Sequence, residues 1–98
     1  MIVYAATKAA QMNMVTNLAK QLAPFGITVN NMSPGVIATP RNYDALADKE
    51  YEKQVLAGIP CGFAGKAEDC AGGILLLCSD EGRYITGIDL PIDGGMKL

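Results

Sequence analysis

YAATKAA, at residues 4–10, predicts the start of the first helix in this chain. Residues four apart on a helix share one face, with their Cβ atoms about 5–6 Å apart. Tyr4 and Lys8 are therefore neighbours if the stretch is helical. A phenol beside a fixed ammonium can serve as proton donor and acceptor, because the cation stabilises the phenolate. Taken alone, the pattern also fits an ordinary helix start with one aromatic residue and one solvated lysine.

The predicted helix covers residues 4–23. Apolar side chains recur at i, i+3, i+4 and i+7 and form one stripe, at Val15, Leu18, Ala19 and Leu22. Pro24 and Gly26 predict the end of the helix. Tyr4 and Lys8 fall at the N-terminal end of the apolar stripe. We therefore expect both side chains to face a cleft and not bulk water.

Two strands and a helix are predicted in the remainder of the chain. β-Branched residues with an alternating face indicate a strand at 27–32, which Pro34-Gly35 ends. A helix is expected over 67–79 and a last strand over 88–92, where Pro91 favours the edge of a sheet. Two strands joined through a helix form a parallel pair. Open α/β sheets bind ligands where a strand ends, although Pro34-Gly35 also fits a plain turn.

Composition excludes several classes of function. A formal net charge of −2 over 98 residues gives no basic footprint for nucleic acid. Apolar runs such as residues 74–78 are too short to cross a membrane, and no signal peptide is visible, so we expect a cytoplasmic protein. Histidine is absent, which excludes a serine–histidine–aspartate triad. The three cysteines fit neither a metal site nor a disulfide framework, and we expect free, at least partly buried thiols at Cys61, Cys70 and Cys78.

The order of these features resembles one known family. YAATK resembles the Y-x-x-x-K motif that opens a long helix in short-chain dehydrogenases/reductases. The strand at 27–32, SPGVIATP at 33–40, the helix at 67–79 and the closing segment at 84–95 follow in that family's order. The resemblance covers the whole chain. The sequence departs from the family at Phe63, where many relatives carry an arginine.

The resemblance implies an α/β fold, the C-terminal portion of a Rossmann-type doubly wound parallel sheet. Its expected parts are a long helix, a strand, a P-G loop, a helical cover, a helix and an edge strand. Residues 1–98 would be the C-terminal part of a single domain, without the N-terminal cofactor-binding half, since no G-x-G-x-x-G occurs. The cover would be residues 41–58, whose loosely helical spacing equally fits a solvated surface helix pair.

The resemblance further implies an oxidoreductase that uses NAD or NADP on a secondary alcohol or ketone. Tyr4 would exchange the substrate's proton, and Lys8 would assist Tyr4 and hold the cofactor ribose. Pro34-Gly35 would form the cofactor loop, in which the Ile37 backbone holds the nicotinamide carboxamide and the Thr39 hydroxyl contacts the phosphates. No metal is expected. Relatives use the first helix between subunits, so a homo-oligomer is expected.

Three interpretations remain open from the sequence. The first is a dehydrogenase whose isolated chain of this length is inactive, because the pyrophosphate loop is missing. The second is a non-catalytic fragment or assembly subunit that keeps the fold of the family but catalyses no reaction. The third is an unrelated α/β binding module. Neither the choice between NAD and NADP nor the substrate follows from these residues.

Overall fold

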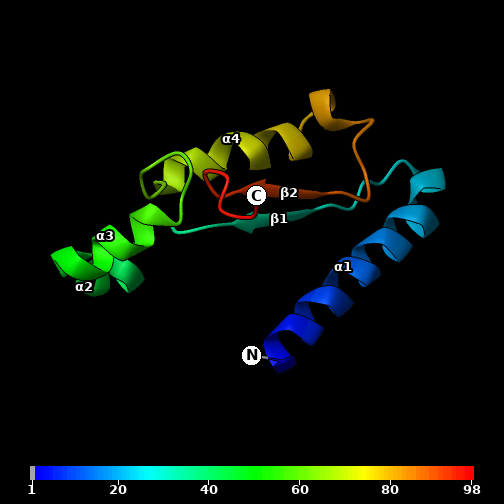
Figure 1. The fold of residues 1–98 in the computed structure, drawn as a ribbon. Helices are drawn as coiled ribbons and strands as arrows, with labels where there is room; N and C mark the ends of the chain where they lie inside the picture. The colour runs from blue at the N-terminus through cyan, green and yellow to red at the C-terminus, as the bar shows by residue number, and fades with distance from the viewer. Residues whose placement is uncertain (1) are drawn as a thin grey trace. The chain divides into compact units, whose positions relative to one another are not determined.

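A computed structural model of the protein describes residues 2–98 (Figure 1). The chain folds into two compact units, and each is assembled from two stretches of sequence. The first unit comprises Met1–Met32 and Leu75–Leu90, and the second comprises Ser33–Ile74 and Pro91–Leu98. The chain therefore passes between the units within both of its strands and within its last long helix.

The first unit begins with α1, Ile2–Leu22, close to the predicted span of 4–23. A short 3-10 helix, Ala23–Phe25, follows it, and Gly26 ends the turn with a left-handed φ of 75°. The Gly26 N–H donates to the Ala23 carbonyl at 3.0 Å. Val15 and Ala19 are the buried residues of α1 and belong to the predicted apolar stripe.

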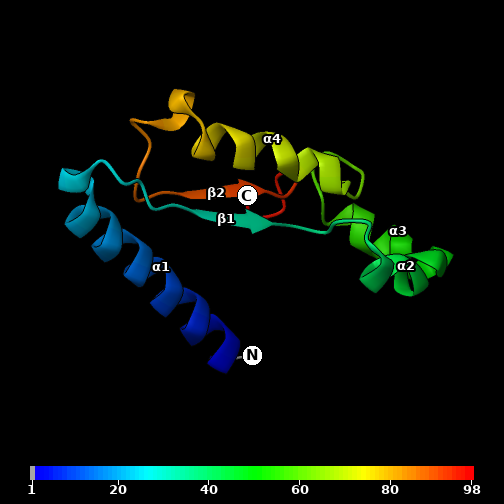
Figure 2. The ribbon, with the colours of Figure 1, turned by 180° about the vertical axis from the view of Figure 1, so that it is seen from behind.

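The two strands, β1 at Asn31–Pro34 and β2 at Asp89–Ile92, pair with each other (Figure 2). The Asn31 N–H donates to the Ile88 carbonyl and the Gly35 N–H to the Ile92 carbonyl, both at 2.9 Å. Both bonds run from β1 to β2 and advance in the same direction along each strand. The pair is therefore parallel, as the connection through a helix predicts.

The first strand begins later than the sequence predicted, at residue 31 and not at 27. The residues just before it pair with a loop through side chains. The Asn30 carboxamide donates to the Ile85 carbonyl at 3.0 Å and accepts from the Ile88 N–H at 3.2 Å. The Val29 N–H donates to the Thr86 hydroxyl at 3.1 Å. Extended, β-branched residues are present here, but side-chain hydrogen bonds and one backbone bond, from the Gly87 N–H to the Val29 carbonyl at 2.8 Å, take the place of a regular ladder.

The helix before β2, α4, spans Ala67–Cys78 and agrees with the prediction of 67–79. Its start is fixed by Asp69, whose carboxylate accepts the Lys66 N–H at 2.7 Å. A 3-10 helix, Asp80–Gly82, follows. A Cβ at Gly82 would collide with the Leu76 carbonyl oxygen, so this turn requires glycine.

The second unit contains the helix pair α2, Pro40–Ala47, and α3, Lys49–Ala57. This confirms helical structure in the region predicted as a cover or surface helix pair. Asp48 separates the helices and caps α3, because its carboxylate accepts the N–H groups of Glu50 and Tyr51 at 3.0 and 3.3 Å. Ile59, only 3% exposed, is buried after α3.

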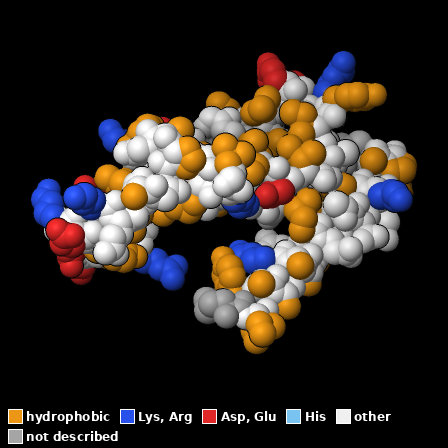
Figure 3. All heavy atoms as spheres, viewed as in Figure 1, with side chains coloured by type: hydrophobic (Ala, Val, Ile, Leu, Met, Phe, Trp, Pro, Cys, Tyr) orange, Lys and Arg blue, Asp and Glu red, His pale blue; other side chains and the backbone are white. Residues whose placement is uncertain are grey.

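All three cysteines are free thiols, as predicted. Cys70 is buried, whereas Cys61 and Cys78 are exposed, so the expected partial burial of all three was wrong for two of them. No helix within residues 2–98 is long and apolar enough to cross a membrane. Apolar side chains are exposed along α1, including Ile2 and Val3 near its start (Figure 3).

Candidate functional site

Tyr4 and Lys8 lie on one face of α1, as their spacing predicted. The Lys8 ammonium nitrogen is 5.5 Å from the centroid of the Tyr4 ring. At this distance a cation is attracted to the face of an aromatic ring. The Lys8 side chain therefore stays beside the phenol and does not extend away from the helix.

The exposure of this pair differs from the prediction. Tyr4 is 58% exposed, and residues 2–11 of α1 are all exposed. The expectation that both side chains face a cleft is wrong for the described chain. The physical reason is that the buried part of α1 is its second half, around Val15 and Ala19, and no described residue covers the first turns.

The P-G loop begins as β1 ends, and Gly35 is essential to its geometry. A Cβ at Gly35 would lie 2.6 Å from the Cβ and 2.7 Å from the Cα of Asp93. Glycine is therefore required because the chain itself approaches so closely. The Asp93 carboxylate in turn accepts the N–H groups of Gly95 and Lys97, at 2.9 and 3.3 Å. Pro34, just before this contact, is exposed.

Ile37 forms an isolated parallel bridge with Gly65. The Gly65 N–H donates to the Val36 carbonyl at 2.9 Å, and the Ala38 N–H donates to the Gly65 carbonyl at 2.8 Å. In such a bridge the central residue turns its own N–H and C=O away from its partner. The peptide groups of Ile37 thus face the opposite edge. There the Ile37 carbonyl accepts the Asn42 side-chain amide at 2.7 Å.

Thr39 is the residue before α2. Its backbone is extended, with φ −122° and ψ 164°, and its carbonyl accepts the Asn42 N–H at 2.8 Å. The Thr39 side chain makes no capping hydrogen bond to α2. Pro40 occupies the first turn, where a missing N–H has no cost. The Thr39 hydroxyl is therefore not committed to the helix start.

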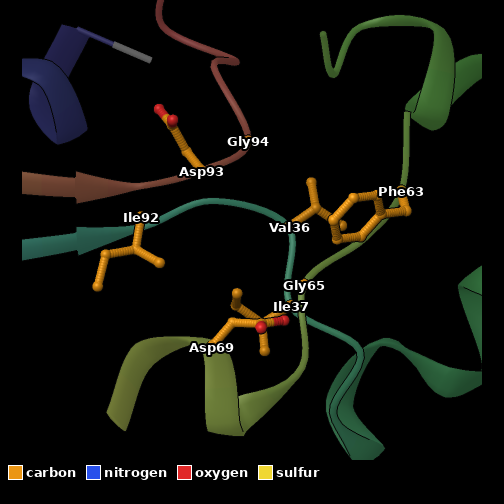
Figure 4. Close-up of a pocket in the computed structure, with 8 residues that line it drawn as sticks. All are labelled: Val36, Ile37, Phe63, Gly65, Asp69, Ile92, Asp93 and Gly94. Atoms are coloured by element: carbon orange, nitrogen blue, oxygen red, sulfur yellow. The ribbon is translucent and has the colours of Figure 1, made fainter. Parts of the chain in front are cut away.

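At least three cavities lie in the second unit, and two of them are lined in part by Phe63. One, of about 150 Å³, is shown in Figure 4 and is lined by Val36, Ile37, Phe63, Gly65, Asp69, Ile92, Asp93 and Gly94. Both of its carboxylates, Asp69 and Asp93, already accept backbone N–H groups. A wider hollow of about 470 Å³ is lined by Ala38, Tyr43, Leu46, Ala47, Glu52, Leu56, Phe63 and Ala64. Phe63 is shared by both.

The predicted site residues divide between the two units. Tyr4 and Lys8 belong to the first unit, whereas Pro34, Gly35, Ile37 and Thr39 belong to the second. Sequence reasoning missed Asn42, which holds the Ile37 carbonyl. The available signal was the position of this asparagine, shortly after a loop whose backbone groups need hydrogen-bond partners. It also missed Gly65, because a bridge between distant segments leaves no local pattern. Among residues 2–98 no cluster of acidic or cysteine side chains could hold a metal ion.

Comparison with known proteins identifies the family. A family model described as enoyl-(acyl carrier protein) reductase matches residues 1–97. The chain belongs to the short-chain dehydrogenase/reductase family, whose members are oxidoreductases. The sequence resemblance is thereby confirmed, and the interpretation as an unrelated α/β module is wrong.

Two curated relatives illustrate the similarity. The L-rhamnose 1-dehydrogenase (NAD(P)(+)) of Azotobacter vinelandii is 40% identical over 93 residues, which are 95% of this chain and 36% of the relative. The cyclohexanol dehydrogenase of a Rhodococcus species is 44% identical over 93 residues, which are 95% of this chain and 34% of the relative. The chain thus spans about a third of the length of these relatives.

A solved structure supports the fold. A 4-hydroxyisoleucine dehydrogenase complexed with NADH superimposes with a TM-score of 0.89 at 31% identity. The match covers 95% of this chain and 38% of that structure's chain. The α/β architecture with a parallel sheet and its structural neighbours confirm the predicted Rossmann-type fold class.

Proposed function

We propose that this chain is the C-terminal part of a single Rossmann-type domain that transfers hydride between NAD or NADP and a secondary alcohol or ketone. The observation that carries the proposal is the Tyr4–Lys8 pair, with ammonium and ring 5.5 Å apart on one helix face. The relatives' names support the reaction class, since they include dehydrogenases of a sugar and of a cyclic alcohol.

Tyr4 is the proposed acid and base. When a ketone is reduced, the Tyr4 hydroxyl donates a proton to the carbonyl oxygen. When an alcohol is oxidised, the Tyr4 phenolate accepts the hydroxyl proton. Lys8 is proposed to assist Tyr4, because its ammonium lies 5.5 Å from the centre of the ring that carries the reacting hydroxyl. Its exposed ammonium can also donate a hydrogen bond to a ribose hydroxyl.

The loop from Pro34 to Thr39 is the proposed cofactor site in the second unit. A bound nicotinamide cofactor supplies the hydride chemistry. Ile37 fits its carboxamide, since that group both donates and accepts and the Ile37 peptide groups face away from Gly65. The Thr39 hydroxyl, which is not used to cap α2, is available for a phosphate oxygen. Pro34 and Gly35 set the path of the loop.

The chain alone is proposed to be inactive. Its sequence has no glycine-rich loop, which is the main anchor for a dinucleotide pyrophosphate. The whole enzyme is proposed to be a cytoplasmic homo-oligomer that binds a small alcohol or ketone. The alternative is a non-catalytic fragment or assembly subunit of the same family.

A hybrid enzyme separates these two interpretations. In it, this chain replaces the matching segment of the A. vinelandii L-rhamnose 1-dehydrogenase. We expect the hybrid to oxidise L-rhamnose with NAD or NADP, and the isolated chain to give no nicotinamide absorbance change with the same reagents. A folded hybrid that binds cofactor without turnover would favour the non-catalytic role. A second hybrid, made with the Rhodococcus cyclohexanol dehydrogenase and tested on cyclohexanol, controls for the foreign substrate.

A further inference from the structure

The Ile37 N–H and carbonyl face away from Gly65, and only one of these two groups has a hydrogen-bond partner among the described residues. The Ile37 carbonyl accepts the amide of the Asn42 side chain at 2.7 Å in a partly buried position. No group among residues 2–98 accepts a hydrogen bond from the Ile37 N–H. Within these residues the Ile37 carbonyl therefore has a hydrogen-bond partner, whereas the Ile37 N–H has none.

The group that donates to the Ile37 carbonyl indicates which kind of ligand could replace it. The Asn42 side chain ends in a primary carboxamide, the same functional group that nicotinamide carries. A primary carboxamide has two N–H donors and one carbonyl acceptor. A ligand carboxamide that pairs with both Ile37 groups would replace the single bond from Asn42 and add a second bond at the free N–H.

We propose that Asn42 is an internal placeholder, which occupies the Ile37 carbonyl until the carboxamide of a nicotinamide ligand displaces it. The inference rests on the proposed role of Ile37 in cofactor binding. Displacement needs only a rotation of the Asn42 side chain, because its backbone N–H remains bonded to the Thr39 carbonyl at 2.8 Å. Asn42 is half-buried, so its released amide can reach water.

A purely structural role for Asn42 makes the opposite prediction. If its hydrogen bond only fastens α2 to the loop, removing it loosens the loop and weakens a ligand there. A placeholder competes with the ligand, so its removal strengthens binding. The sign of the change in affinity therefore distinguishes the two roles.

The test uses the full chain with Asn42→Ala and with Asn42→Asp, which keeps the shape but removes the amide donor. Nicotinamide is the probe, and its binding is followed at the backbone amide of Ile37 by NMR with isoleucine labelled in the main chain. Asn17→Ala is the matched control, since Asn17 uses its carboxamide within α1, on Asn13. 3-Acetylpyridine is the control ligand, because its ketone cannot donate a hydrogen bond to the Ile37 carbonyl.

We expect both Asn42 variants to bind nicotinamide about two- to tenfold more tightly than the parent chain, the range of one net hydrogen bond. The Asn17 control should match the parent, and 3-acetylpyridine should gain nothing. The Asn42 variants could instead bind nicotinamide equally or more weakly while the Ile37 amide signal still shifts on binding. That result would contradict the placeholder role of Asn42 and leave the proposed cofactor site intact. No response of Ile37 in any form would instead overturn the proposed carboxamide site, and the placeholder with it.

Discussion

The ammonium of Lys8 lies 5.5 Å from the centre of the Tyr4 ring, one helical turn away on α1. The contact is local, since it depends on helix geometry and not on any distant segment. It therefore forms wherever residues 2–22 are helical.

Lys8→Ala in the hybrid enzyme should lower both the turnover rate and the affinity for the cofactor. The reason is that Lys8 has two proposed partners, the Tyr4 phenolate and the cofactor ribose. Steady-state kinetics with cofactor titration measure both effects. Lys20→Ala, which removes an exposed lysine near the other end of α1, is the matched control and should leave both values unchanged. A Lys8 variant that loses only affinity would remove the proposed assistance to Tyr4.

Gly35→Ala and Gly72→Ala should change stability in opposite directions. A Cβ at Gly35 would lie 2.6 Å from Asp93, and overpacking of this kind costs about 1–3 kcal/mol. Gly72 lies inside α4 with no atom within 4 Å of an added Cβ, so alanine there should stabilise the helix by up to about 1 kcal/mol. Urea unfolding of the two variants beside the parent measures both changes. Equal stability of the parent and Gly35→Ala would show that the loop does not approach Asp93 in solution.

Local periodicity accounts for what the sequence predicted well. The apolar stripe at Val15, Leu18, Ala19 and Leu22 predicts a helix with one buried face. Val15 and Ala19 are buried, whereas Leu18 is 37% exposed. The parallel pairing of β1 and β2 follows from two strands joined through a helix. These are properties of short segments or of their order along the chain, so they can be inferred without coordinates.

The parts that were missed depend on contacts between distant segments. The strand was placed four residues too early, because residues 29 and 30 are bonded mostly through the side chains of Asn30 and Thr86, with a single backbone bond to Gly87, and not through a regular ladder. The bridge between Ile37 and Gly65 has no local signature. The exposure of Tyr4 could not be inferred from α1 alone, because it depends on which segments pack against the helix.

The isolated chain should self-associate. Large apolar side chains are exposed at the start of α1 and on α4, with Ile2 86% and Leu75 70% exposed. Parallel sheets are normally covered on both faces, and open strand edges pair with other chains. Size-exclusion chromatography with light scattering at micromolar concentration is the measurement. Ile2→Lys should reduce association, whereas Lys49→Arg, which keeps the charge of an exposed residue, should not. A monodisperse monomer that unfolds cooperatively would show that these surfaces need no partner.

The most direct test of the central claim is Tyr4→Phe in the hybrid enzyme, which removes one hydroxyl group and keeps the ring beside Lys8. We expect the turnover rate to fall by about 10²–10⁴-fold, the usual contribution of a positioned acid or base. Cofactor affinity should change little, since the proposed cofactor contacts of the loop are untouched. Turnover at the rate of the parent hybrid, with the variant folded and cofactor bound, would contradict the assignment of Tyr4 as the catalytic acid and base.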